Sequence, residues 1–332
     1  MNDHDRFENV TPSVLPRDER SDRRQLAAPA LAVSVMFLVT VLAQLVLVLL
    51  VQLFAPWIAQ QDWYLIVASN GPMYAIAMPL SLLCYRMSVA EPPQKKKLGV
   101  PAFLGLIPIC FALTYIGNII GSVVNEVIAT FTGEPVTNEL QELSLSLPLW
   151  ATFLFMGVLA PILEEIFYRK LVIDRLLRFG ELPAILISGI LFGLIHANFS
   201  QFFYAAMLGM VFGYIYIRTG RLRYTVALHM IVNMVGGVYA SEMLKMIDMD
   251  AMAENVMGYF LQNPLPLFLL LGYYAFIGIC FVAAPITIAL FWKHIRIQRA
   301  ENPLTAKEWV CIGVKNPAVW VLAVVIVLMF IL

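Results

Sequence analysis

Charged side chains are scarce in this sequence: Asp, Glu, Lys and Arg make up 13% of the 332 residues, and hydrophobic residues make up 61%. A typical soluble domain has about 25% charged residues. This shortage excludes an ordinary soluble fold. The formal net charge is zero, so overall charge gives no indication of a nucleic-acid partner, and we expect none.

Cysteine is also rare, and the sequence lacks the pattern of a signal peptide. The four cysteines stand singly, without the close pairs of metal and redox motifs, so we interpret them as packing residues. The first 26 residues are hydrophilic, and no short apolar core with a cleavage site follows. We therefore predict that residues 1–26 form a disordered cytosolic tail.

Long apolar segments are plentiful, and each can form a helix that crosses a membrane. A span needs about 20 apolar residues, and backbone inside a bilayer has to satisfy its own hydrogen bonds. These requirements predict an all-α polytopic helix bundle with eight or nine spans. The segments are 27–54, 63–85, 102–130, 149–168, 183–198, 201–217, 224–240, 265–292 and 317–332.

Basic residues indicate the orientation of the bundle in the membrane. Lys and Arg cluster in the N-terminal tail and in the predicted loops or segments at 86–97, 169–182, 218–223 and 293–315, whereas Lys245 stands alone on the other side. Because cytosolic loops are enriched in Lys and Arg, we expect the N-terminus in the cytosol. With nine spans the C-terminus lies outside. We therefore expect a multi-pass integral membrane protein.

Adjacent glutamates interrupt the span at 149–168. Glu164 and Glu165 follow an apolar run, and Arg169 comes four residues after Glu165, close enough to pair with it on one helical face. An ionisable group inside a span costs about 2.5–3.5 kcal/mol on insertion scales. A charged helix end at the headgroups is the simpler reading, but two such residues together favour a functional site.

Two of the four histidines also fall within predicted spans. His196 comes four residues after Phe192, and His229 comes four residues before Asn233, which puts imidazole and carboxamide on one helical face. A single buried histidine is more often structural than catalytic. Two histidines, two glutamates and an asparagine on three spans favour a catalytic site.

The order of these residues resembles a known family. The patterns Glu164-Glu165-x-x-x-Arg169, Phe192-x-x-x-His196 and His229-x-x-x-Asn233 are similar to the three signature motifs of the CPBP family, which unites type II CAAX prenyl endopeptidases with bacteriocin-processing and immunity proteins. The resemblance covers about 148–240. It divides the chain into the tail, N-terminal membrane helices at 27–135, core helices at 148–240 and C-terminal membrane helices at 241–332.

The resemblance implies an intramembrane endopeptidase and a role for each motif residue. Glu164 would be the general base on water, His196 would hold and polarise that water, and His229 and Asn233 would donate to the oxyanion. Glu165 belongs to the same catalytic set and would pair with Arg169, with Tyr168 and Phe192 as supporting residues. The substrate would be a membrane-associated peptide or protein in the lipid bilayer.

Two questions stay open from the sequence. Glu164, His196 and His229 could hold zinc with an open water position, although the HExxH pattern is absent and a water mechanism needs no metal. A non-catalytic immunity or regulatory protein that binds a peptide is the alternative function, and a proton-coupled transporter is a weaker one because no inverted repeat is evident. For a peptidase, we expect the site to open to the cytosol or sideways to the inner leaflet.

Overall fold

The computed structural model describes residues 18–61, 63–134, 136 and 139–331, and every regular element among them is helical. This confirms the predicted all-α class. Six helical segments are long and apolar enough to cross a membrane, and a bent pair, Ala306–Val314 with Pro317–Phe330, would make a seventh. The predicted segments at 183–198 and 224–240 are also helical, but Glu181–Leu194 has 14 residues and is shorter than a full span.

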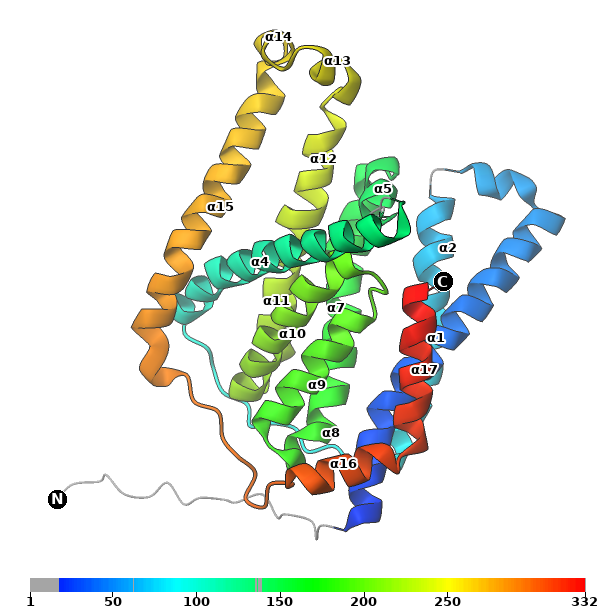
Figure 1. The fold of residues 1–332 in the computed structure, drawn as a ribbon, viewed down its shortest axis with the longest axis vertical. Coiled ribbons are helices and arrows are strands. Elements are labelled where there is room, and N and C mark those ends of the chain that lie inside the picture. Colours follow the sequence, from blue (N-terminus) through cyan, green and yellow to red (C-terminus); the bar gives the residue numbers. More distant parts are fainter. Residues whose placement is uncertain (1–17, 62, 135, 137–138, 332) are drawn as a thin grey trace.

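The first and last helices stand together at one edge of the bundle (Figure 1). The second predicted span packs beside the first helix. It is helical, with a π-helical segment between two α-helical ones and a 3-10 helix at its end. The elements of this edge are α1 (Glu19–Phe54), η1 (Pro56–Gln60), α2 (Tyr64–Pro72), η2 (Met73–Ala77), α3 (Met78–Ser81), η3 (Leu82–Met87), α16 (Ala306–Val314) and α17 (Pro317–Ile331).

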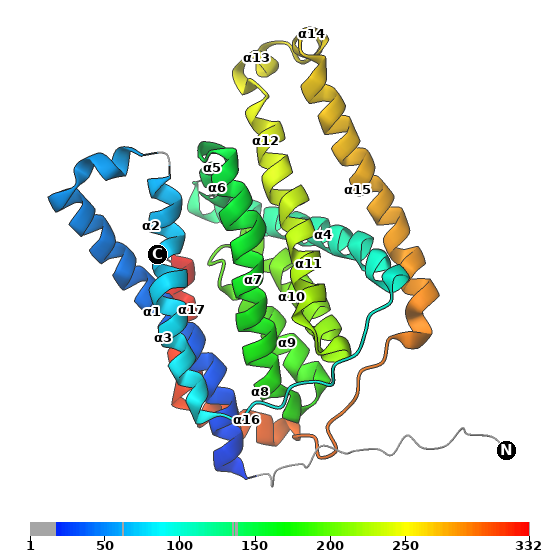
Figure 2. The same ribbon diagram turned by 180° about the vertical axis from the view of Figure 1, so that it is seen from behind.

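The centre of the molecule is a group of packed helices crossed by the long, oblique α4 (Figures 1 and 2). The elements are α4 (Val100–Thr132), α5 (Glu139–Ser146), α6 (Leu149–Ala151), η4 (Thr152–Leu159), α7 (Ala160–Glu165), η5 (Ile166–Ile173), α8 (Asp174–Leu176), η6 (Leu177–Phe179), α9 (Glu181–Leu194), α10 (Phe199–Thr219), α11 (Leu222–Asn233), η7 (Met234–Tyr239) and α12 (Ala240–Lys245).

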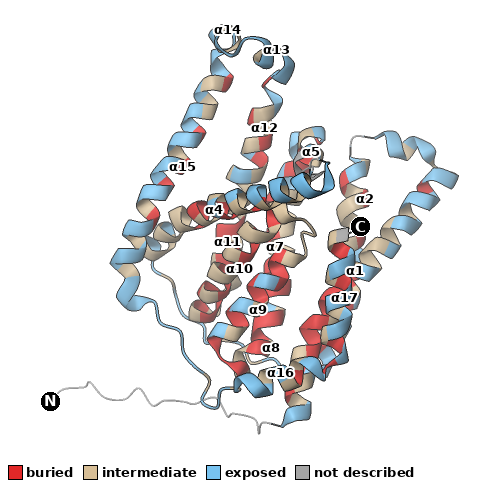
Figure 3. Ribbon diagram, viewed as in Figure 1, coloured by how far each residue is buried: buried red, intermediate tan, exposed pale blue. Residues whose placement is uncertain are grey.

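The segment after α12, at the other edge, completes the fold. It consists of α13 (Met249–Glu254), α14 (Val256–Gln262), α15 (Pro264–Phe291) and η8 (Trp292–His294). Figure 3 shows that buried residues concentrate in α7 to α11, whereas α15 and the upper half of α1 are mostly exposed. The buried core therefore lies around the helices that carry the three motifs.

Two predicted boundaries are wrong. The helix α1 begins at Glu19, inside the predicted disordered tail, because Asp18 caps it by accepting a hydrogen bond from the Ser21 amide at 2.7 Å. The Asp22 side chain is buried and pairs with Arg178 at 3.3 Å, which holds this first turn against the core. The rest of the predicted tail, residues 1–17, lies outside the described residues.

The second wrong boundary is the predicted loop at 169–182. The helix that starts at Leu149 continues to Phe179, so Arg169, Lys170, Arg175 and Arg178 are helical. The chain turns only at Gly180, whose φ of 104° suits glycine. The charges are tolerated inside the bundle because protein groups contact them; for example, Arg175 donates to Ser88 Oγ at 2.9 Å.

Basic segments gather at one end of the bundle, called here the basic end, as the sequence predicts. Two extended connections, 88–99 and 295–305, run across the ends of α8, α9 and α10 (Figure 1). Their backbone is fixed there: the Lys96 amide donates to the Thr219 carbonyl at 2.8 Å, and the Gln298 amide donates to Glu181 Oε2 at 2.6 Å. Among the described residues the basic segments lie at one end, and the assignment of that end to the cytosol is a proposal.

Glycines let α9 and α10 approach closely, as their spacing of four predicts. A Cβ atom on Gly209 would lie 2.8 Å from the Gly189 Cα atom and 3.1 Å from the Phe192 ring. A Cβ atom on Gly193 would lie 2.7 Å from the Phe202 carbonyl oxygen. These contacts fix Phe192, and with it the helix end that carries His196.

We expect Gly209→Ala to destabilise the protein by about 1–3 kcal/mol, because the added methyl group meets backbone and forces the helices apart. Thermal unfolding in detergent measures the change. Gly272→Ala is the matched control, since a Cβ atom on Gly272 meets nothing within 4 Å. Equal melting temperatures for the two variants would contradict the close packing.

Candidate active site

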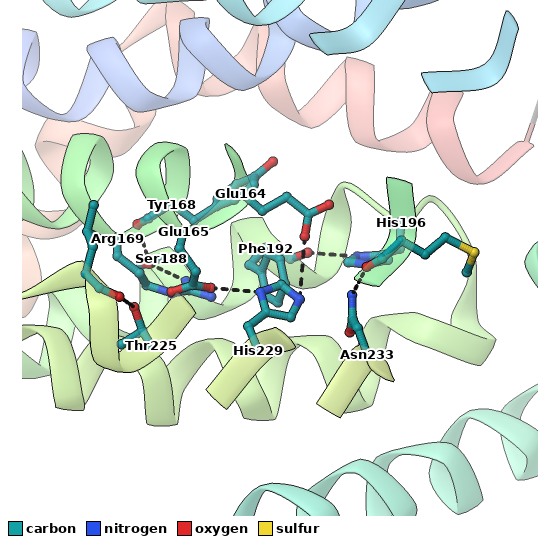
Figure 4. Close-up of polar contacts among 12 residues, drawn as sticks. Glu164, Glu165, Tyr168, Arg169, Ser188, Phe192, His196, Thr225, His229 and Asn233 are labelled. Atoms are coloured by element: carbon teal, nitrogen blue, oxygen red, sulfur yellow. Dashed lines mark hydrogen bonds and ion pairs between the residues drawn. The ribbon is translucent and has the colours of Figure 1, made fainter. Parts of the chain in front are cut away.

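The three motifs meet in the centre of the bundle (Figure 4). Glu164 and Glu165 end α7, His196 follows α9, and His229 and Asn233 lie on the last turns of α11. The Glu164 side chain points towards His229, and Oε2 of the glutamate is 3.8 Å from Nε2 of the histidine. Four of the predicted catalytic residues thus lie on helices and His196 lies in the turn after α9, and all five surround one region.

His229 lies between the two glutamates. Its Nδ1 atom is 3.2 Å from Glu165 Oε1, within hydrogen-bond distance, while the 3.8 Å separation from Glu164 is an ion-pair contact that is too long for a direct hydrogen bond. Each ring nitrogen therefore faces one carboxylate. The contact with Glu165 fixes the ring, and Nε2 is directed at the space beside Glu164.

The predicted pair of Glu165 and Arg169 is present and fully buried. Arg169 Nε donates to Glu165 Oε2 at 3.0 Å, and both side chains have 0% exposure. Arg169 also donates to Ser188 Oγ at 2.9 Å, and that hydroxyl donates to the Tyr168 carbonyl at 2.8 Å. Ser188 therefore links the Arg169 side chain to the backbone carbonyl of Tyr168.

Two aromatic rings enclose Arg169 and His229. The guanidinium carbon lies 4.7 Å from the Phe192 ring centre and 5.8 Å from that of Phe212, and the His229 ring is 5.5 Å from each. A cation over an aromatic face is attracted by the ring quadrupole. The predicted support by Phe192 thus has a geometric basis. Phe212 is not among the predicted site residues, because no spacing signal distinguishes it from the other apolar residues of α10.

His196 and Asn233 lie at the end of the site away from Arg169 (Figure 4). His196 Nδ1 is 3.0 Å from the Phe192 carbonyl oxygen. A carbonyl accepts only, so Nδ1 carries the proton of a neutral ring and Nε2 can accept a hydrogen bond. Asn233 Nδ2 donates to the Met156 carbonyl at 2.9 Å, which leaves its second N–H for another acceptor.

The turn after α9 presents His196 with a strained backbone. Ala197 has φ of 55°, in the left-handed region that residues with a Cβ atom rarely adopt. The Asn198 side chain stabilises the turn by donating to the His196 carbonyl at 2.6 Å and by capping α10 through the Gln201 amide at 2.9 Å. Such strain recurs at functional sites, where surrounding contacts hold it.

Access from the basic end is closed by packed side chains. Tyr168 and Arg169, about one turn nearer that end, have 1% and 0% exposure, and Glu165 has 0%, whereas the Glu164 side chain is 14% exposed. The opening of the site, to the cytosol or sideways to the inner leaflet, stays a prediction. His196 and Asn233, at the other end of the site, are partly exposed.

Comparison with known proteins supports the resemblance seen in the motifs. The family model described as "Type II CAAX prenyl endopeptidase Rce1-like" matches residues 146–235, which contain all five predicted catalytic residues. The protein "Putative membrane peptidase YdiL" of Bacillus subtilis (strain 168) is 27% identical over 141 residues, or 42% of this chain.

That match covers 57% of the Bacillus protein, less than two thirds of its length. No significant match was found among solved structures. The motif order, the helices that carry it and the two matches agree on one assignment. Residues 146–235 are therefore similar to the CPBP family of intramembrane proteases.

Proposed function

We propose that the chain is an endopeptidase that hydrolyses a peptide bond of a membrane-associated peptide or protein with a water molecule activated by Glu164. The observation that carries the proposal is the Glu164 carboxylate beside His229 Nε2, at 3.8 Å, with His196 and Asn233 next to them (Figure 4). A carboxylate base, an imidazole acceptor and two side-chain N–H donors are the groups that amide hydrolysis by water requires.

In the proposed reaction, Glu164 takes a proton from water as the oxygen attacks the carbonyl carbon of the substrate. His196 Nε2 accepts a hydrogen bond from the same water and orients it. The carbonyl oxygen becomes an oxyanion, which His229 Nε2–H and the second N–H of Asn233 stabilise. The C–N bond then breaks, and the proton held by Glu164 passes to the leaving amine. The other fragment keeps the new carboxyl terminus.

Zinc has no ready site among the described side chains, where no three His, Cys, Asp or Glu residues are arranged to hold a metal ion. Catalytic zinc usually has three protein ligands and an open position. The Nδ1 atoms of His229 and His196 face Glu165 and the Phe192 carbonyl oxygen, contacts that a ligating histidine can also make. The described residues do not gather three such ligands, and the proposed steps use protein groups and water alone.

We expect hydrolysis to continue when metal is removed. Purified protein treated with EDTA and with 1,10-phenanthroline should retain its kcat, because neither the base nor the oxyanion donors depend on a metal in the proposed steps. Product formation from a cleaved peptide measures the rate. Loss of activity on chelation, with recovery when zinc is added back, would contradict the metal-free reaction.

The proposed substrate class follows from the position of the site inside the bundle. The site residues lie among helices that span or line the membrane, so a substrate has to enter the bilayer or its interface. The matched family is named for prenyl endopeptidases, but the residues described here identify no prenyl group. The proposal also places the N-terminus in the cytosol and the C-terminus outside, from the basic residues.

A regulatory or immunity protein that binds a peptide without cleaving it is the second candidate function. Mass spectrometry of membrane peptides separates the two, using cells that carry the intact protein or Glu164→Gln. A peptidase gives peptides with new C-termini only in cells with the intact protein. Identical peptide sets in both cells, with a peptide captured by both proteins, would favour the binding function.

A further inference from the structure

Glu164 receives a hydrogen bond from a helix that lies outside the residues matched by the family model. The Tyr74 hydroxyl, on η2, donates to Glu164 Oε1 at 3.2 Å. The two residues are 90 positions apart in the sequence. The family model covers residues 146–235, so the N-terminal helices supply a contact to the central carboxylate of the site.

This contact divides the two oxygens of Glu164 between different partners. Oε1 accepts from the Tyr74 hydroxyl, and Oε2 faces His229 Nε2 at 3.8 Å. A carboxylate bonded at one oxygen keeps a defined rotation about its last torsion, which is otherwise broad. The oxygen beside His229 is therefore the one presented to a water molecule in the site.

The local fold explains why Tyr74 reaches the core. The segment from Met73 to Ala77 is a widened π turn, between Pro72 in α2 and Pro79 in α3. Pro79 has no N–H and cannot continue the regular hydrogen-bond ladder, and single π turns of this kind often occur at functional sites. The segment packs against α1, which supports it from the outer side.

We propose that Tyr74 is a positioning residue for Glu164. Its hydroxyl holds Oε1, so that Oε2 is the oxygen that takes the proton from water. The segment from α2 to α3 thereby completes a site whose other groups lie between residues 146 and 235. The inference rests on the proposed function of Glu164 as the base. It assigns to the N-terminal helices a part in the reaction beyond anchoring the core.

The kinetic test compares two Tyr→Phe variants of the same helical segment. Tyr74→Phe removes the donor to Glu164 and should lower kcat about tenfold, the loss expected for one hydrogen bond to a charged group, with KM unchanged. Tyr85→Phe is the matched control: its hydroxyl is buried and has no hydrogen-bond partner among the described residues, so kcat should be unchanged. Equal kcat values for the two variants would overturn the proposal.

A second measurement tests the contact without using activity. The melting temperature in detergent is measured for Tyr74→Phe, for Glu164→Leu and for the double variant. If the two side chains interact, the shift of the double variant differs from the sum of the single shifts. Additive shifts would show that the contact is absent and would overturn the inference.

The two measurements separate a failure of the inference from a failure of the proposed function. Non-additive shifts, together with a tenfold loss in Tyr74→Phe alone, support both. A protein that cleaves peptides at the same rate with and without the Tyr74 hydroxyl refutes the positioning role only. A protein that cleaves no membrane peptide, although the shifts are non-additive, refutes the hydrolytic function and leaves the Tyr74 contact in place.

Discussion

Glu164→Gln is expected to lower the rate of peptide hydrolysis by about 10²–10⁴-fold, the usual contribution of a general base. Glutamine keeps the size of the side chain but cannot take a proton from water. The Tyr74 hydroxyl can still donate to the amide oxygen, so the fold and the binding of substrate should be retained. The measurement is kcat and KM of the purified protein on a peptide found by mass spectrometry.

Glu126→Gln is the matched control for this loss. Glu126 lies on α4, and its side chain is exposed, away from the site residues. Its replacement changes charge by the same amount and should leave kcat unchanged. A Glu164→Gln protein that retains more than about a tenth of the normal rate would show that Glu164 is not the base.

Arg169→Ala should destabilise the protein by about 3–5 kcal/mol, the usual effect of removing one partner of a buried ion pair. Both side chains of the pair with Glu165 have 0% exposure, so the substitution leaves a buried carboxylate without its cation. It also removes the donor to Ser188 Oγ and the contact with the Phe192 ring. Thermal and denaturant unfolding in detergent measure the change.

The chain offers its own comparison for this prediction. Glu19 and Arg23 form another pair with the same spacing of four residues, but their side chains are 54% and 34% exposed. Exposed pairs contribute little, so Arg23→Ala should have a small effect. Combining Arg169→Met with Glu165→Gln should destabilise less than Arg169→Ala alone, because no unpaired charge stays buried. Similar losses for Arg23→Ala and Arg169→Ala would contradict the importance of burial.

Much of the site could be predicted from local spacing. Residues four apart on a helix share a face, and this rule places Arg169 beside Glu165. The cost of polar groups in a bilayer identifies His196, His229 and Asn233 as residues that need partners, and the structure gives each of them one. The spacing of Gly189 and Gly193 likewise predicts the close approach of α9 and α10.

Contacts between residues far apart in the chain could not be predicted from the sequence. Tyr74 contacts Glu164 across 90 positions, and Phe212 reaches His229 from another helix, without any periodic signal for either. Periodicity analysis also assumes 3.6 residues per turn. The segments η5 and η7, which adjoin Glu165 and Asn233, and η4, which precedes α7, have wider π turns that this assumption misses.

The wrong boundaries have one physical cause. In the sequence, Lys and Arg residues predict the end of a membrane span. Arg169 is neutralised inside the bundle by Glu165, and Arg178 is paired with Asp22, so the helix continues through both positions to Phe179. The buried pair of Glu165 and Arg169 also lies next to Glu164 on the side of the basic end. A charge can be buried only beside a suitable partner, and the tertiary fold determines which residue that partner is.

The central claim is that Glu164 activates water for peptide hydrolysis, and cleavage in water enriched in ¹⁸O tests it most directly. Purified protein in lipid vesicles is incubated with a membrane peptide, and the products are weighed by mass spectrometry. We predict one ¹⁸O atom in the new carboxyl terminus and about 10²–10⁴-fold slower formation of product by Glu164→Gln. Equal amounts of labelled product from the intact protein and from Glu164→Gln would contradict the account.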